Sequence, residues 1–277
     1  MESMRKMMKE EVKRSLRSSG MLISLILGII IAIVQVFHYQ IPAYQLNQEL
    51  DFEKVPILFF NTIADSWIGG SPTYLESFLY FLILPILATL PFGASYFTDT
   101  RSGFLKGIYI RSSRKQYLTA KYVASFISGG IAVTIPLLLN LACGMILLPK
   151  LVPQSVLPHN GINAANLFFK IYFSKPLLYI IVFLCIDFLL GGIWAGVALA
   201  ASFISDYKIV VLSSPFFLQL VMHVICTMLN KIEYSSVYFA QSGYGLFHSG
   251  IVVVYFVVGG VVTWIVFRKR GEKEDVF

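Results

Sequence analysis

Charged residues are scarce in this chain, and their scarcity decides its broad class. Only 13% of the 277 residues are Asp, Glu, Lys or Arg, while 57% are hydrophobic, and the mean hydropathy is +0.73. A soluble globular domain is nearer half apolar and about one quarter charged. The composition therefore argues against a soluble domain and predicts an integral membrane protein.

Cysteine is also scarce, and nucleotide-binding sequence is missing. The three cysteines, Cys143, Cys185 and Cys226, each fall in a different apolar run, so we interpret them as small core residues, without zinc spacing or a disulfide framework. The scattered histidines have no clustered acids or cysteines around them, so we expect no metal site. The chain has no G-x-x-x-x-G-K-[ST] loop, so we expect no ATP chemistry here.

Six apolar runs approach the length of about 20 residues that a helix needs to cross a bilayer. They cover residues 21–38, 77–97, 122–148, 177–203, 209–229 and 249–267. The fifth is the weakest, because Pro215, Gln219 and His223 interrupt it. We predict an all-α membrane protein with a single six-span domain over residues 21–267, in which Pro85, Pro91 and Pro136 kink the second and third spans.

The distribution of lysine and arginine predicts the orientation. Residues 1–20, the segment 98–121, Lys208 and the tail 268–277 together carry 17 of these residues, whereas the segments on the other side carry five. Lys and Arg concentrate in cytoplasmic segments, so we expect both termini to be cytoplasmic in a cell membrane. The net charge of +7 is explained by this placement, and we expect lipids rather than nucleic acid as its partner.

Three extracytoplasmic segments then remain, at residues 39–76, 149–176 and 230–248. The first carries most of the acids and an apolar patch at 55–60, and the second carries an aromatic run suited to the headgroup level. The third mixes aromatics with Gly243 and Gly245. It is either a short re-entrant element whose backbone the protein buries, or a set of aromatic anchors at the interface.

Residues 1–20 predict an amphipathic helix on the cytoplasmic side. Apolar residues recur there at helical spacing, namely Met1, Met4, Met8, Val12 and Leu16, with basic residues on the other faces. Such a helix lies in the interface plane of a membrane. It serves either as an orientation anchor or as a docking surface beside a cytoplasmic subunit.

The segment 98–121 carries an apolar face that a simple connection would not need. Read as a helix, it places Phe104, Leu105, Ile108 and Tyr109 together, with Asp99 and Ser102 as N-cap residues and with Gly103 and Gly107 allowing close backbone approach. A short amphipathic helix of this kind fits a groove on a partner protein, or lies on lipid with its basic residues at the headgroups.

The same segment carries a resemblance to a known family. T-D-x-x-S-G-F-x-K at residues 98–106, followed by R-S-S-R-K-Q-Y-L-x-A-K at 111–121, resembles the type-2 ABC exporter permeases, as does the layout of a basic amphipathic helix before six spans. The likeness in layout covers the whole chain, and the likeness in residues is confined to about 97–122.

This resemblance implies a coupling helix in the first cytoplasmic loop, seated in a cleft of a separate ATPase subunit that binds ATP and Mg. The residues that it assigns to this contact are Asp99, Ser102, Gly103, Phe104 and Lys106, and we add Arg101, Ile108 and Arg111 of the same segment. It also implies a second permease copy or a similar permease as partner, and no cofactor on this chain.

Polar residues inside the predicted spans are further candidates. Asp187 is the only carboxylate in a span, and because no span holds a basic mate, we favour a structural role, either hydrogen-bonded within the bundle or wetted near the interface, over a proton or ion role. Gln35, Asn140, Gln219 and His223 either line a pathway or cross-link the bundle. Gly192, Gly196 and Ala200 form a small-residue face for helix contact or for a dimer seam.

We therefore expect a non-enzymatic permease subunit of an ATP-driven exporter, moving an amphipathic or lipophilic substrate such as a peptide, lipid or drug. An ion-gradient-driven secondary transporter is one alternative, although internal repeats and a charged midplane site are not evident. A membrane enzyme acting on lipids would need convergent polar residues that the sequence does not offer. An ABC-like immunity or sensor complex that extracts a peptide from the membrane would share every feature above.

Overall fold

The computed structural model describes residues 2–49, 61–71, 73–150, 162, 166, 168–244 and 249–273, and within these ranges it contains helices and no strand. The α-helices are α1 (Glu2–Leu16), α2 (Ser19–Gln35), α3 (Ile41–Glu49), α4 (Ile63–Ser66), α5 (Leu75–Thr89), α6 (Ser95–Arg101), α7 (Phe104–Arg111), α8 (Arg114–Leu147), α9 (Phe169–Ser174), α10 (Pro176–Ala201), α11 (Lys208–Met228), α12 (Ser236–Phe239), α13 (Ser249–Val254) and α14 (Gly260–Lys273). Two π-helical turns, Val36–Gln40 and Tyr255–Gly259, join α2 to α3 and α13 to α14.

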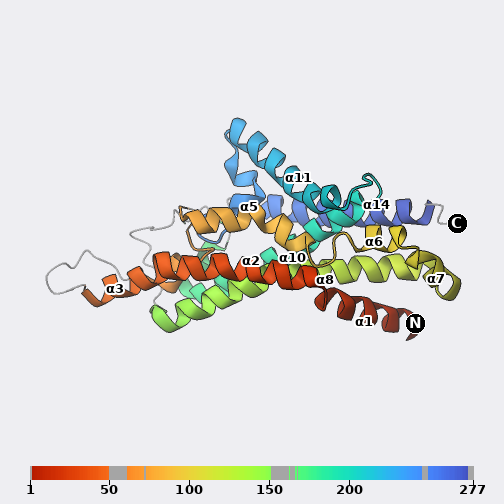
Figure 1. Cartoon of the computed structure of the whole chain (residues 1–277). Coiled ribbons are helices and arrows are strands. Elements are labelled where there is room, and N and C mark those ends of the chain that lie inside the picture. Colours follow the sequence, from red (N-terminus) through yellow and green to blue (C-terminus); the bar gives the residue numbers. More distant parts are fainter. Residues whose placement is uncertain are drawn as a thin grey trace.

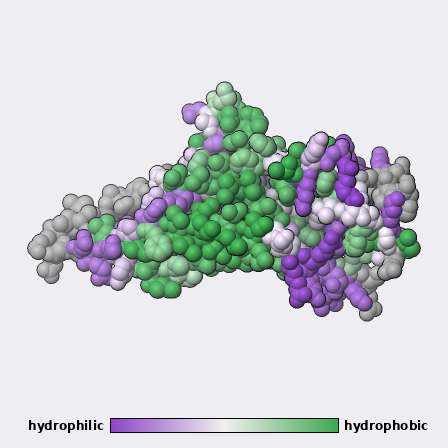
Figure 2. Space-filling model, in the orientation of Figure 1, coloured by the Kyte–Doolittle hydropathy of each residue, from purple (hydrophilic) through white to green (hydrophobic). Residues whose placement is uncertain are grey.

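Five helices in this part of the chain are long and apolar enough to cross a membrane: Ser19–Glu49, α8, α10, α11 and Val252–Lys273. Figure 2 shows the hydrophobic surface that they give to the middle of the molecule, with hydrophilic residues gathered at its ends. The prediction of an all-helical multi-pass membrane protein is thus confirmed at this level. The second predicted run, 77–97, contains α5, whose 15 residues extend about 22 Å, less than the hydrocarbon thickness of about 30 Å.

The run 77–97 is broken rather than kinked, and Pro91 explains why. Pro91 has no backbone N–H to donate to the carbonyl of Leu87, and α5 ends at Thr89, two residues before it. The hydroxyl of Ser24 in α2 donates to that carbonyl at 2.7 Å instead. The chain then turns through residues 90–94 and begins α6 at Ser95.

Side chains also replace the hydrogen bonds that two other prolines remove. Pro85 lies inside α5, and the amide of Gln219 donates to the carbonyls of Phe81 and Leu82 at 2.9 Å each. Pro215 lies inside α11, and the hydroxyl of the preceding residue, Ser214, donates at 3.0 Å to the carbonyl four residues before the proline. Carbonyls without a backbone donor are costly in an apolar interior, so these side chains make the interrupted helices tolerable.

α8 begins eight residues before the predicted third span. Its 34 residues extend about 51 Å, so that its first turns, which carry Arg114, Lys115 and Lys121, continue beyond the apolar middle. Figure 1 shows this end of α8 beside α1, α6 and α7, with both chain termini at the same end of the elongated molecule and α3 at the other. The predicted loop 98–121 therefore comprises the end of α6, all of α7 and the first turns of α8.

The small-residue face of α10 is used within the chain. A Cβ added to Gly192 would lie 2.6 Å from the ring of Phe126, and one added to Gly196 would lie 3.1 Å from the ring of Tyr122. Gly191 and Gly129 of α8 approach each other as closely. Of the two predictions for Gly192 and Gly196, helix contact within the bundle is the one that the structure supports, and Ala200 remains partly exposed beside them.

At the other end, residues 235–244 are covered by protein. The indole of Trp67 donates to the hydroxyl of Ser242 at 3.1 Å, and the backbone N–H of Gly243 donates to the carbonyl of Gly69 at 2.9 Å. Ser235, Val237 and Gln241 are fully buried. This segment therefore meets the condition that a re-entrant element requires, whereas Gly245, the patch 55–60, and residues 151–161, 163–165 and 167 of the second outer segment lie outside the described residues.

We expect Gly129→Val to lower the stability of the bundle, because the new side chain would meet Ala195 Cβ and the carbonyls of Gly191 and Ala88, all within 3 Å of the Cβ position. The expected loss is about 1–3 kcal/mol, measured as thermal unfolding in detergent. Gly260→Val is the matched control, since nothing lies within 4 Å of its Cβ position. Equal midpoints for the two variants would contradict this account of the α8–α10 contact.

Candidate functional site

One lysine of α8 is buried completely, and it organises the end of the molecule that holds α1, α6 and α7. The Lys121 side chain has no exposed surface, and its Nζ lies 2.9 Å from Glu11 Oε2 and 2.5 Å from Asp99 Oδ2. Removing an ammonium group from water costs several kcal/mol unless close opposite charges and hydrogen bonds compensate. The two carboxylates, one from α1 and one from α6, supply that compensation.

Arg14 completes the arrangement, which we call the four-charge cluster (Glu11, Arg14, Asp99 and Lys121). Its guanidinium donates to both oxygens of Asp99, at 2.6 and 3.1 Å, in the bidentate geometry that favours arginine over lysine. The Tyr117 hydroxyl donates to Asp99 Oδ2 at 2.6 Å. Two positive and two negative groups thus balance, and they join the three helices α1, α6 and α8.

The balance fixes the charge state of Asp99. Burial alone would raise the pKa of this carboxyl group, but the hydrogen bond from Arg14, together with the charge and hydrogen bond of Lys121, outweighs it and holds the pKa below its usual value of 3.8. The same hydrogen bond raises the pKa of Arg14. Asp99 is therefore a carboxylate at neutral pH, committed to contacts within this chain.

The cluster extends to α7 through aromatic rings. The Lys121 ammonium lies 4.4 Å from the ring centroid of Phe92, and the Arg14 guanidinium lies 5.1 Å from that of Phe104, the first residue of α7. Both distances are within the range of cation–π attraction. The position of α7 is thereby tied to the charges that hold α1 and α6 against α8.

The start of α7 differs from the prediction. Gly103, with a φ of +73°, occupies the N-cap position in the left-handed region that glycine adopts without strain. Asp99 lies inside α6 and Ser102 ends that helix, so the prediction that these two residues cap α7 was wrong. The predicted partner contact of Asp99 is also replaced, since its side chain is only 1% exposed.

The predicted apolar face of α7 is divided between the interior and the surface. Leu105 is fully buried in a small core with Tyr96, Tyr117 and Phe267, and Tyr109 packs edge-on against Tyr117. Phe104 remains 48% exposed, and Ile110 is 79% exposed on the outer side of the helix. Only part of the face that the sequence predicted is therefore free.

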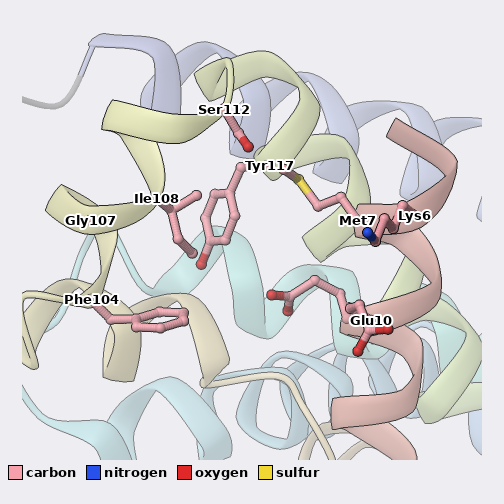
Figure 3. A pocket seen from close by; sticks show the side chains of 9 residues that line it. Lys6, Met7, Glu10, Phe104, Gly107, Ile108, Ser112 and Tyr117 are labelled. Carbon is pink, nitrogen blue, oxygen red and sulfur yellow. The ribbon is translucent and has the colours of Figure 1, made fainter. Parts of the chain in front are cut away.

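A groove lies between α1 and α7, as Figure 3 shows. Its volume is about 630 Å³, within the range of pockets that hold ligands or side chains of a partner. The apolar lining comes from three helices: Phe104 and Ile108 of α7, Met7 of α1 and Tyr117 of α8. The remaining lining residues are Lys6, Glu10, Glu11, Gly107 and Ser112. The groove therefore combines an apolar floor with charges of both signs.

The other residues predicted for the coupling surface are not among those that line this groove. Lys106 is exposed, and Arg111 is the last residue of α7. Arg101 is exposed at the end of α6 and forms an ion pair with Asp206, in the connection between α10 and α11. A Cβ at Gly103 or Gly107 would meet no atom within 4 Å, so neither glycine is needed for a close approach within this chain.

Two of the predicted span residues meet in a single polar network near the C-terminal end of α8. The Asn140 amide donates to Gln35 at 2.7 Å, and its oxygen accepts from the backbone N–H of Ile68 at 2.8 Å. Gln40 donates to both Gln35 and Asn140. The π-turn explains the pairing, since it brings residues five apart, such as Gln35 and Gln40, to the same side of the helix.

The remaining polar residues of the spans divide into bonded and unbonded groups. Gln219 bonds to α5 as described above, and His223 Nδ1 lies 2.9 Å from the hydroxyl of Ser235. These contacts, like those of Gln35 and Asn140, favour the cross-linking interpretation over a pathway. Asp187 is the exception: it is fully buried, and neither carboxylate oxygen has a hydrogen-bond partner within the described ranges. The hydrogen-bonded structural role that we favoured for it is not what the structure has.

Within the described residues no three His, Cys, Asp or Glu side chains are grouped closely enough to hold a metal ion. Comparison of the chain with protein-family models, with curated proteins and with solved structures found no match. The candidate site therefore rests on its geometry: a charge-anchored α1–α7 groove at the end of the bundle that holds both termini.

We expect Lys121→Met to destabilise the protein by about 3–5 kcal/mol, because it leaves Glu11 and Asp99 buried beside only one cation, Arg14. Lys115→Met, an exposed position on the same helix, should change the unfolding free energy by less than about 0.5 kcal/mol. Adding Asp99→Asn to Lys121→Met should recover part of the loss, since the two sites are coupled. Chemical or thermal unfolding in detergent measures all three, and additive effects would contradict the cluster.

Proposed function

We propose that this chain is the membrane-spanning permease subunit of an ATP-driven ABC exporter, and that the α1–α7 groove receives a cytoplasmic ATPase subunit. ATP and Mg bind in that partner, and this chain is not itself an enzyme. Two permease copies, or this chain and a similar one, flank a pathway for an amphipathic or lipophilic substrate such as a peptide, lipid or drug.

The observation that carries this proposal is the anchoring of α7. A short helix that only connects two spans does not need a buried four-charge cluster to fix it, nor a half-exposed Phe104 beside a groove. A helix that receives force from a partner needs both a contact surface and a rigid attachment to the bundle. The loose sequence resemblance at residues 97–122 supports the same function.

The arrangement of the chain supports the orientation that the proposal requires. Both termini lie at the end that carries α1, α6 and α7 (Figure 1), which fits an even number of crossings, with α5 as the sixth, shorter one. The excess of lysine and arginine at this end favours the cytoplasmic side. We further propose that α1 lies along the membrane interface, as its polar and apolar faces suggest.

Phe104→Asp tests the groove directly. We expect it to reduce binding of the ATPase subunit at least tenfold, because a carboxylate would have to be buried in the apolar part of the contact. Membrane insertion and the thermal midpoint should stay near those of the native chain. Co-purification with the ATPase and ATP-driven transport in vesicles are the measurements.

Ile204→Asp is the matched control for that substitution. Ile204 is 78% exposed in the connection between α10 and α11, and the control introduces the same carboxylate outside the groove. Phe104→Leu, which keeps an apolar side chain, should retain coupling. Normal transport by Phe104→Asp, or transport by the native chain with no ATP-hydrolysing subunit present, would overturn the proposal.

An ion-gradient-driven transporter is the second candidate, and Asp187 is the observation that favours it. A fully buried carboxyl group with no partner in the described part of the chain is expensive, and such groups often mark ion or proton pathways.

The two candidates predict different outcomes for Asp187→Asn. For an ATP-driven permease, we expect transport to persist in this variant and in native vesicles whose proton gradient an uncoupler has collapsed. The thermal stability of Asp187→Asn should be unchanged or higher, because the buried carboxyl group makes no hydrogen bond within the described residues that the substitution would remove. Loss of transport in both tests, with stability intact, would favour the ion-driven mechanism instead.

A further inference from the structure

The C-terminal end of α14 carries a second pocket, separate from the α1–α7 groove. Its volume is about 380 Å³, and it is lined by Phe203, which follows α10, and by Lys269, Arg270 and Lys273 of α14. Three cations around one aromatic side chain give a concave surface of a single sign of charge.

In the part of the chain that the structure describes, these three cations form no ion pair. Their neighbour Arg268 pairs with Glu272 at 3.0 Å, and Asp206 pairs with Arg101. Within the described residues, Lys269, Arg270 and Lys273 have no ion-pair partner, and all three are exposed. The pocket therefore presents three positive charges that the described residues do not balance.

The position of the pocket along α14 indicates which kind of anionic molecule could reach it. Val261, Val262 and Ile265 give α14 an exposed apolar surface, and the partly exposed ring of Trp264 lies under the guanidinium of Arg268 at 5.8 Å. Apolar side chains facing lipid, then an aromatic residue, then cations is the order that a membrane helix shows where it leaves the bilayer. The pocket thus lies at the depth of the lipid headgroups.

We propose that this pocket binds the phosphate headgroup of an anionic phospholipid, with the acyl chains along the exposed apolar face of α14. Basic pockets beside membrane helices at this depth recognise such headgroups, because each nearby Lys or Arg adds favourable electrostatic attraction. The proposal requires only that α14 crosses the membrane, and it stands whether or not the chain works with an ATPase.

The test compares lipid binding to the purified full chain with phosphatidylglycerol and with zwitterionic phosphatidylcholine, by native mass spectrometry or by titration in detergent. We expect phosphatidylglycerol to bind more tightly. The triple substitution Lys269→Gln, Arg270→Gln and Lys273→Gln should weaken its binding by roughly 10- to 100-fold, and leave phosphatidylcholine binding unchanged.

A control variant removes the same charge elsewhere. Lys9, Lys106 and Lys115 are exposed and lie outside the pocket, so changing all three to glutamine should leave phosphatidylglycerol binding within about twofold of the native value. Because all six substitutions are on the surface, unfolding midpoints should confirm that both variants are folded.

Three outcomes would overturn the proposal. Equal loss in the two triple variants would mean diffuse attraction to the basic end of the protein. Equal binding of the two lipids by the native chain would mean that the headgroup charge is not recognised. Competition by glycerol phosphate at the same concentration as the lipid would mean a site for small anions, without a role for the acyl chains.

Discussion

The buried charge of Lys121 is the constraint on which the proposed cytoplasmic end depends. An ammonium group in a low-dielectric interior is tolerated only with close opposite charges, and these come from α1 and α6. Arg14 balances the second carboxylate, and its guanidinium also contacts the ring that begins α7. The helices are thus held by groups that cannot be separated singly without exposing a buried charge.

A surface salt bridge would not have this effect, because water and salt would screen it and either partner could leave at little cost. Because the charges of this cluster are buried, neither partner of a pair can leave at little cost. The helices α1, α6 and α8, together with α7 through Phe104, therefore behave as one rigid unit. The apolar contacts around Leu105 and Phe267 strengthen this unit, but apolar contacts tolerate sliding, whereas the bidentate contact of Arg14 with Asp99 fixes a geometry.

Much of the fold was predictable because it follows from composition and periodicity. Five of the six apolar runs correspond to long helices, and the helical residues 2–16 follow the spacing of the N-terminal methionines. The second run, 77–97, contains only the shorter helix α5: the expected kink at Pro91 is instead a break, because apolar composition continues there but the backbone donor is missing. Hydropathy measures side chains and carries no information about that donor.

The candidate site was predictable only in part, for a related reason. The segment 98–121 and its residue Phe104 were identified from the spacing of apolar residues. Lys121 was counted only as one of the basic residues that predict orientation, and no role was predicted for Glu11 in the basic N-terminal segment. Charge pairs between residues about 20 and 110 positions apart leave no local pattern. The available signal was the presence of acids, Glu11 and Asp99, in predominantly basic segments, and its meaning depends on how the helices are placed in space.

The length of α8 has a mechanical consequence. The continuous helix α8 carries Lys121 near one end and Asn140 near the other, about 28 Å apart along its axis. Lys121 pairs with Asp99 of α6, whereas Asn140 accepts a hydrogen bond from the backbone of Ile68. A tilt imposed where Lys121 is clamped must therefore displace the residues that Asn140 holds on the opposite side of the bundle. Pro136 is the one proline between them, so the stiffness of that short stretch decides how much of a push at one face arrives at the other.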